Sequence, residues 1–131
     1  MTSYKIAENA MEYRKAHELV KSEGVVDMPL SFPTILAFDG EEVVGVLGTD
    51  VSSGYIVAGP LVLKSDKKRT FTIIRLVEAY DYAMRSAGVK SFIFSTALEN
   101  KKWLEYIDTV LECKPYCYKD GRAWFVRKLE G

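Results

Sequence analysis

The chain lacks the residues from which metal sites and disulfide frameworks are built. Among its 131 residues there is one histidine, His17, and there are two cysteines, Cys113 and Cys117. A structural zinc site takes about four nitrogen or sulfur ligands, so this set is too small. We therefore expect no metal, and we expect both cysteines to be reduced, partly buried thiols.

Long apolar runs and net charge are missing too. No run approaches the ~20 apolar residues that cross a bilayer, and residues 1–5 do not form the apolar core of a secretion signal. The 18 basic and 18 acidic residues cancel, so no overall field attracts the chain to nucleic acid or to a membrane. These absences predict a cytoplasmic protein with neither kind of partner.

What is present is an ordinary globular composition with alternating strand and helix patterns. With 48% hydrophobic residues, residues 1–131 are expected to form one domain. Asp39-Gly40 and Asp120-Gly121 lie between apolar runs and predict hairpins. The expected strands are residues 3–7, 34–38, 42–48, 55–63, 89–96, 116–118 and 123–129, and the expected helices are residues 9–24, 73–87 and a segment after Asn100. This order predicts a mixed α/β fold, a sheet of six or seven strands with helices on both faces.

The stretch from residue 55 to residue 96 is the most informative. It reads as a strand, a turn carrying Lys67, Lys68 and Arg69, an amphipathic helix and a second strand. A helix that follows a strand directs unpaired N–H groups and a partial positive charge beyond the strand's end. With three cations beside it, this turn is a candidate anion site, and phosphate is the expected ligand.

One dipeptide in the first of these strands does not fit a regular ladder. Gly59-Pro60 lies inside residues 55–63. Since proline cannot donate a ladder hydrogen bond, we expect a bulge or an edge there.

A family resemblance rests on the order of elements, the hairpin at Asp39-Gly40, the strand–turn–helix at residues 55–88, the strand 89–96 and the helix that follows Asn100. Together these features resemble the GNAT superfamily of N-acetyltransferases. The resemblance covers nearly the whole chain. It implies an acyl-CoA-dependent N-acyltransferase that transfers an acetyl or other acyl group directly to an amine within a ternary complex.

The resemblance also implies site residues. In that family acyl-CoA, here acetyl-CoA or another acyl-CoA, lies where two parallel strands part, which would be residues 55–63 and 89–96. Main-chain groups of the first strand would bind the pantetheine arm of the cofactor, and the turn would bind its pyrophosphate. The asparagine before the last helix would also contact the pantetheine arm. A tyrosine would be the general acid. The implied residues are Leu61, Val62 and Leu63 for the strand; Lys68, Arg69, Thr70, Phe71, Thr72 and Ile73 for the turn; and Asn100 and Tyr106.

The turn departs from the family pattern. That pattern places glycines where the backbone approaches the phosphates, and the corresponding positions here hold Arg69, Phe71 and Ile73. A second interpretation is therefore open: a catalytically inactive GNAT-like binding or assembly module, of viral or mobile-element origin. A homodimer that pairs edge strands is compatible with either.

Each implied residue also has a structural interpretation. A threonine of the turn or Asn100 can serve as a helix cap, and the cations of the turn can be solvated. Tyr106 can pack beside Trp103 in the core. No residue stands out as a general base, because residues 55–63 contain no carboxylate, and Glu41, Glu42 and Asp50 lie at turns.

Overall fold

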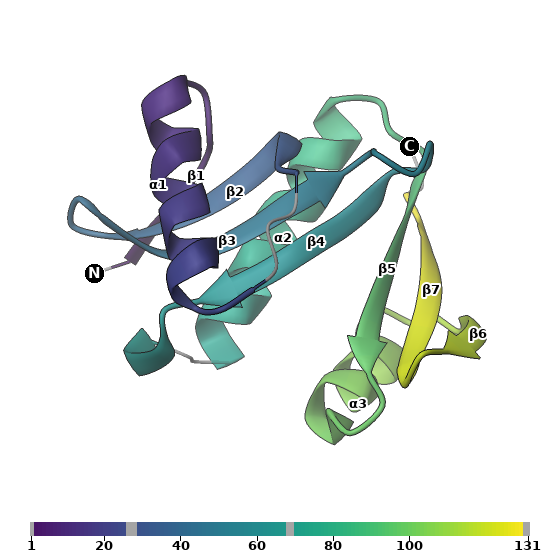
Figure 1. Cartoon of the computed structure of the whole chain (residues 1–131). Coiled ribbons are helices and arrows are strands. Elements are labelled where there is room, and N and C mark those ends of the chain that lie inside the picture. The colour runs from purple at the N-terminus through teal and green to yellow at the C-terminus, as the bar shows by residue number, and fades with distance from the viewer. Residues whose placement is uncertain (1, 26–28, 68–69, 130–131) are drawn as a thin grey trace.

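A computed structural model describes residues 2–25, 29–67 and 70–129 of the chain. Its elements follow the predicted order, with a short 3₁₀ turn added before the second helix (Figure 1). The elements are β1 (Thr2–Ile6), α1 (Ala10–Ser22), β2 (Ser31–Asp39), β3 (Glu42–Asp50), β4 (Val57–Leu63), η1 (Ser65–Lys67), α2 (Thr70–Ser86), β5 (Ser91–Ala97), α3 (Lys101–Thr109), β6 (Pro115–Lys119) and β7 (Arg122–Lys128).

The strands form one seven-stranded sheet in the order β1-β2-β3-β4-β5-β7-β6. Neighbours are antiparallel except β4 and β5, which are parallel and are connected through α2. The predicted mixed α/β class is thereby confirmed. None of the described helices is long and apolar enough to span a membrane.

Two apolar layers sandwich the first half of the sheet. On one face α1 packs Leu19 and Val20 against Leu36 and Val46 of β2 and β3. On the other face α2 covers the alternate residues of the same strands in a cluster that includes Ile35, Ala37, Leu47, Leu76, Tyr80 and Met84. A smaller cluster joins α3 to β7 through Ile107 and Phe125. Helices therefore cover both faces, as predicted.

Strand β2 begins earlier than its sequence pattern indicated. The strand was expected over residues 34–38, yet it begins at Ser31, which pairs with Thr49 of β3. The register shifts before the next pair, between Ile35 and Leu47, and this irregularity accommodates a residue without an N–H donor.

The bulge predicted at Gly59-Pro60 is present. Leu47 pairs with Leu61 and Thr49 pairs with Ala58, so two residues of β4 oppose the single residue Gly48 of β3. Gly59 has φ 142°, a backbone conformation that residues with a Cβ rarely adopt.

Both cysteines of the chain are free thiols, as expected from their number. Cys113 is buried and donates its thiol hydrogen to the backbone carbonyl of Val126 at 3.3 Å, while Cys117 is half-buried.

Candidate active site

The main feature of the sheet is the gap between its two parallel strands. β4 and β5 share one residue pair, Val57 with Ile93, supported by the hydrogen bond from the Ile93 N–H to the Ile56 carbonyl at 2.9 Å. Beyond this pair the strands diverge (Figure 1). β4 therefore has an edge that faces the gap from Ala58 to Leu63.

The register with β3 shows which backbone groups of β4 face the gap. The Lys64 N–H donates to the Val44 carbonyl at 2.8 Å, so this pair is a hydrogen-bonded one. Because hydrogen-bonded and non-hydrogen-bonded pairs alternate in an antiparallel ladder, Val62 with Val46 is hydrogen-bonded as well. Leu61 and Leu63 belong to the other type, and their N–H and C=O groups point away from β3.

These outward groups have no strand to bind. Among the described residues, no backbone partner is found for the amides of Leu61 and Leu63. Unpaired edge groups readily accept an added extended chain. Of the three residues predicted to offer main-chain groups, Leu61 and Leu63 present them to the gap, and Val62 uses its own in the ladder with β3.

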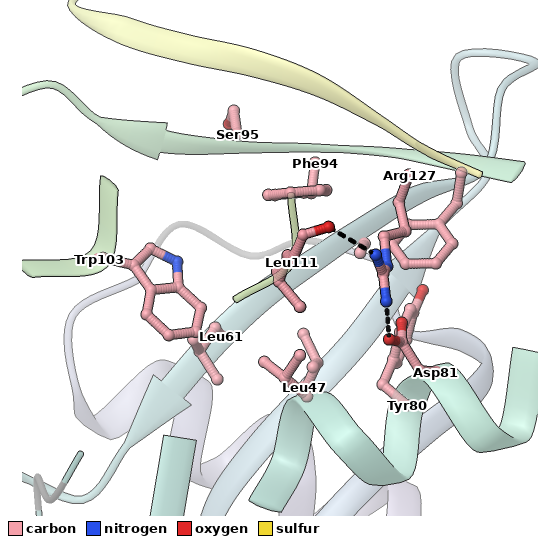
Figure 2. A pocket seen from close by; sticks show the side chains of 12 residues that line it. Leu47, Leu61, Tyr80, Asp81, Phe94, Ser95, Trp103, Leu111 and Arg127 are labelled. Atoms are coloured by element: carbon pink, nitrogen blue, oxygen red, sulfur yellow. Dashed lines mark hydrogen bonds and ion pairs between the residues drawn. The ribbon is translucent and has the colours of Figure 1, made fainter. Parts of the chain in front are cut away.

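A pocket lies inside the gap, between the diverging strands and the helices beside them (Figure 2). Its volume is about 70 Å³. The wall is mainly aliphatic and aromatic, and it is formed by Leu47, Ala58, Leu61, Val77, Tyr80, Asp81, Phe92, Phe94, Ser95, Trp103, Leu111 and Arg127.

An ion pair closes one end of this pocket. The Arg127 guanidinium of β7 donates to the Asp81 carboxylate of α2 at 2.8 Å and to the Leu111 carbonyl at 3.1 Å. Both charged side chains are mostly buried, at 18% and 16% exposure. The Arg127 Nε is buried and has no hydrogen-bond partner. The pair joins β7 to α2, the helix that covers one face of the first half of the sheet.

The ring of Tyr80 lines the pocket, and its hydroxyl forms a hydrogen bond on the other side of the pocket wall. The Thr49 hydroxyl donates to the Pro33 carbonyl at 2.7 Å, so the Tyr80 hydroxyl is the donor in its 2.6 Å contact with Thr49. Burial raises the pKa of the Tyr80 phenol far above its usual range, which keeps this donor protonated.

The predicted phosphate turn lies where β4 ends and α2 begins. Lys68 and Arg69 lie outside the described residues. In the first turn of α2, Thr70 is exposed, Thr72 is buried and Ile73 is half-buried. The N–H groups of this turn have no acceptor within the helix, so the anion site at this turn stays a prediction.

Phe71 occupies one of the positions where glycine was expected, yet it does not fill the gap. Its side chain is 62% exposed, and its ring lies 4.9 Å from the guanidinium carbon of Arg75, one turn further along α2. The aromatic side chain is therefore directed along the outside of the helix.

Asn100 is the N-cap of α3. Its side-chain oxygen accepts a hydrogen bond from the Trp103 N–H at 3.3 Å. This confirms that it can serve as a cap. A contact with a ligand then falls to its amide nitrogen, which is a donor.

Tyr106 lies one turn after Trp103 on α3, and the two rings stack with centroids 4.9 Å apart and planes 4° from parallel. Trp103 forms part of the pocket wall. Burial raises the pKa of the Tyr106 phenol above its ordinary value of 10.0, and the carboxylates of Glu78 and Asp81 raise it further. The hydroxyl therefore stays protonated at neutral pH, as a general acid requires.

Two of the three carboxylates considered as general bases are engaged in contacts with other residues. Glu42 pairs with Lys64 at 2.7 Å. Asp50 accepts hydrogen bonds from the backbone and hydroxyl of Ser52, which lower its carboxyl pKa. No described group of three or more His, Cys, Asp or Glu residues is placed to hold a metal ion.

Asp81 and Arg127 were missed by the sequence analysis, although a signal existed. Ala123 and Phe125 of β7 and Leu129 directly after it are buried, and Arg127 continues this alternation at a position where an apolar residue is expected. A charged residue on the buried face of a strand requires a partner. The sequence alone did not indicate that the partner would come from α2.

Comparison with known proteins identifies the fold. No family profile and no curated protein sequence matches the chain. Many solved structures do match. The ribosomal-protein-S18-alanine N-acetyltransferase from Escherichia coli superposes with a TM-score of 0.73 at 12% identity, covering 100% of this chain and 96% of that one.

Two further structures extend the comparison. The diaminobutyrate acetyltransferase EctA from Paenibacillus lautus, solved with L-2,4-diaminobutyric acid and coenzyme A, gives a TM-score of 0.70 at 14% identity, covering 98% of this chain and 95% of that one. An acetyltransferase of the GNAT family from Staphylococcus aureus gives 0.67 at 8% identity, covering 98% and 100%. The chain therefore has the fold of the GNAT acetyltransferases.

Proposed function

We propose that this chain is an acyl-CoA-dependent N-acyltransferase that transfers an acyl group directly to an amine. One observation carries the proposal: β4 and β5 share a single residue pair and then part around a pocket. The helix that follows β4 begins at the open end of the same gap. The N-acetyltransferases with this fold, one of them solved with coenzyme A, support the assignment.

The donor groups of the gap match the chemistry of coenzyme A. Its pantetheine arm contains two amides, and the unpaired backbone groups of Leu61 and Leu63 lie two residues apart, roughly 7 Å along the strand. Backbone N–H groups at Thr70–Ile73 and the cations Lys68 and Arg69 would bind the pyrophosphate. The amide of Asn100 would contact the arm from α3.

The chain acts chiefly by positioning the two reactants. Acyl-CoA supplies an activated thioester carbonyl. The amine nitrogen attacks this carbon, a C–N bond forms and the C–S bond breaks. The sulfur leaves as a thiolate, and the nitrogen gives up one proton to solvent water. Holding the amine against the carbonyl removes much of the entropic barrier. Backbone N–H groups that face the gap would polarise the carbonyl oxygen.

Tyr106 is proposed as the general acid. A thiol of this type has a pKa of about 8.5 and a phenol one of about 10, so the phenol is protonated when the thiolate departs. A protonated hydroxyl beside the sulfur would stabilise the leaving group and pass it a proton.

Calorimetry tests the binding step in separate titrations of the protein with coenzyme A, acetyl-CoA and ATP. ATP is the control, because it has the phosphates and lacks the pantetheine arm. We expect both coenzyme A species to bind and ATP to bind more weakly, because ATP has no arm for the open edge of β4. Release of free thiol from acetyl-CoA with a panel of amines then tests turnover. No heat with coenzyme A at millimolar concentration would contradict the proposal.

A second candidate is a binding or assembly module that has kept the fold and lost the chemistry. The absence of glycines at Arg69, Phe71 and Ile73 favours it, and so does the engagement of Asp81 by Arg127. Binding of coenzyme A without thiol release with any amine would support this candidate.

A further inference from the structure

The pocket lies at the closed end of the gap, far from the phosphate turn. Since β5 is parallel to β4, α2 must run back from the open end of the gap toward Val57 and Ile93, where the strands meet. At 1.5 Å per residue Tyr80 is roughly 15 Å along α2 from Thr70, and at 3.3 Å per residue Ala58 is roughly 16 Å along β4 from Leu63. Both residues line the pocket. An arm that enters at the turn therefore reaches the pocket with its far end.

The inner wall of the pocket is suited to a hydrocarbon chain. It presents Leu47, Ala58 and Phe92 together with the ring of Tyr80, whose hydroxyl is bound to Thr49 behind the wall. Apolar surroundings of this kind favour apolar groups by roughly 0.8 kcal/mol for each buried methylene.

The charged groups of the pocket are already balanced, although the Arg127 Nε is buried without a hydrogen-bond partner. The Arg127 guanidinium is neutralised by Asp81. The Ser95 hydroxyl accepts a hydrogen bond from the Arg122 side chain at 2.8 Å. An added carboxylate in the pocket would have no unpaired cation to balance it, and burying an unbalanced charge is costly. The pocket therefore favours an uncharged chain end.

The volume sets the length of the chain. An apolar cavity of about 150 Å³ takes up benzene, which has six carbons. By the same measure the 70 Å³ of this pocket holds about three carbons, whereas an acetyl group places one carbon beyond its carbonyl.

We propose that this pocket binds the acyl chain, and that the preferred acyl donor carries an unbranched, uncharged chain of about four carbons rather than acetyl. This inference rests on the proposed function. In the transfer step the chain itself is unchanged: the thioester carbon exchanges its C–S bond for a C–N bond, and the thiolate leaves.

The test is calorimetry of the unmodified protein with coenzyme A, acetyl-CoA, butyryl-CoA and succinyl-CoA. Two additional buried methylenes predict that butyryl-CoA binds about tenfold more tightly than acetyl-CoA. Succinyl-CoA has the same length but ends in a carboxylate, and it should bind more weakly than butyryl-CoA. Equal affinity for acetyl-CoA and butyryl-CoA would overturn the inference, and so would tighter binding of succinyl-CoA, since Arg127 would then be recognising a carboxylate.

Two variants locate the effect in the pocket. Ala58→Leu fills the inner wall and should abolish the tenfold preference, whereas Ala97→Leu, at a half-buried β5 position outside the pocket, should preserve it. If Ala58→Leu fails to fold, Leu61→Ala gives the converse test, because a larger pocket should shift the preference toward six carbons. An unchanged preference in whichever pocket variant folds would overturn the inference.

The proposed function and the acyl pocket can be refuted separately. No binding of coenzyme A itself would refute the proposed function and the inference together. Binding of coenzyme A with no dependence on chain length would refute the acyl pocket alone.

Discussion

The two neighbours of β5 make an instructive comparison. Along β7, all seven residues of β5 are paired, from Ser91 with Lys128 to Ala97 with Arg122. Along β4, one residue is paired, Ile93 with Val57. Both neighbours are strands of seven residues, so strand length does not explain the difference.

Geometry and connection explain it. β7 pairs with β5 as an antiparallel ladder, whereas β4 reaches β5 only through α2 and carries the Gly59-Pro60 bulge beside the single shared pair. The same gap that weakens the sheet presents the unpaired backbone of Leu61 and Leu63. The side of β5 that faces β7 is thus a structural junction, whereas the side that faces β4 is a candidate binding site.

The largest effect is expected from Arg127→Met. With one ladder pair between the halves, the contact of Arg127 with Asp81 of α2 is one of those that join them, beside the packing of Phe92 on Tyr80. Removing the cation leaves Asp81 mostly buried without its partner, and we expect a loss of about 3 kcal/mol in the free energy of unfolding, the lower end of the range for such pairs. Urea unfolding measures it.

Two comparisons keep this prediction specific. The double variant Arg127→Met with Asp81→Leu should recover most of the loss, since no buried charge is left unpaired. Arg14→Ala, which breaks an exposed pair with Glu18, should cost no more than about 0.5 kcal/mol. Equal effects of Arg127→Met and Arg14→Ala would contradict the role given to Arg127.

The next effect concerns chemistry on the open side of β5. Tyr106→Phe should lower kcat about 100-fold, the magnitude typical of a lost general acid, and leave acetyl-CoA affinity unchanged. Tyr118→Phe is the matched control, because Tyr118 is an exposed tyrosine of β6, beyond the fully paired strand β7.

The pH dependence follows from the direction of the Tyr106 shift. An acid must be protonated to act, and its pKa is raised above 10.0. Activity that depends on it should therefore persist to pH 10 and decline only above that. A decline centred well below pH 10 in the unmodified protein, absent in Tyr106→Phe, would contradict the raised pKa.

Gly59→Ala addresses the point at which the strands part. The φ of 142° at Gly59 strains any residue that has a Cβ, and such strain costs about 1–3 kcal/mol. We expect a loss of about 2 kcal/mol in thermal or urea unfolding, against no more than about 0.5 kcal/mol for Ser53→Ala in the exposed turn before β4, where the hydroxyl accepts a long 3.5 Å bond from the Tyr55 N–H. A neutral Gly59→Ala would show that the bulge does not require this backbone conformation.

The smallest effect is expected from Arg69→Glu in the predicted phosphate turn. Loss of one charge-assisted hydrogen bond to a phosphate should weaken acetyl-CoA binding about tenfold. Lys128→Glu makes the same change of charge at an exposed position on β7 and should leave the affinity unchanged. Equal affinities in both variants would remove Arg69 from the phosphate site.

The sequence predicted those features of the fold that depend on neighbouring residues. Hairpins at Asp39-Gly40 and Asp120-Gly121, the bulge at Gly59-Pro60 and the cap at Asn100 each follow from local backbone chemistry. The start of β2 was missed because its pairing with β3 prevails over Pro33.

The parts of the site that depend on distant residues were less predictable. Asp81 and Arg127 are 46 residues apart, and no local pattern links them. Which of Leu61, Val62 and Leu63 faces the gap depends on the register with β3, which residue types do not reveal. The turn at residues 68–69 lies outside the described residues and stays a prediction.

Amide hydrogen exchange of β4, with and without coenzyme A, tests directly whether the open edge of this strand binds the pantetheine arm. We expect Leu61 and Leu63 to exchange quickly in the free protein while Val62, bonded to β3, is protected. Coenzyme A should slow the exchange of Leu61 and Leu63 and leave that of Val62 unchanged. Slow exchange of Leu61 and Leu63 in the free protein, or exchange unaffected by saturating coenzyme A, would contradict such binding.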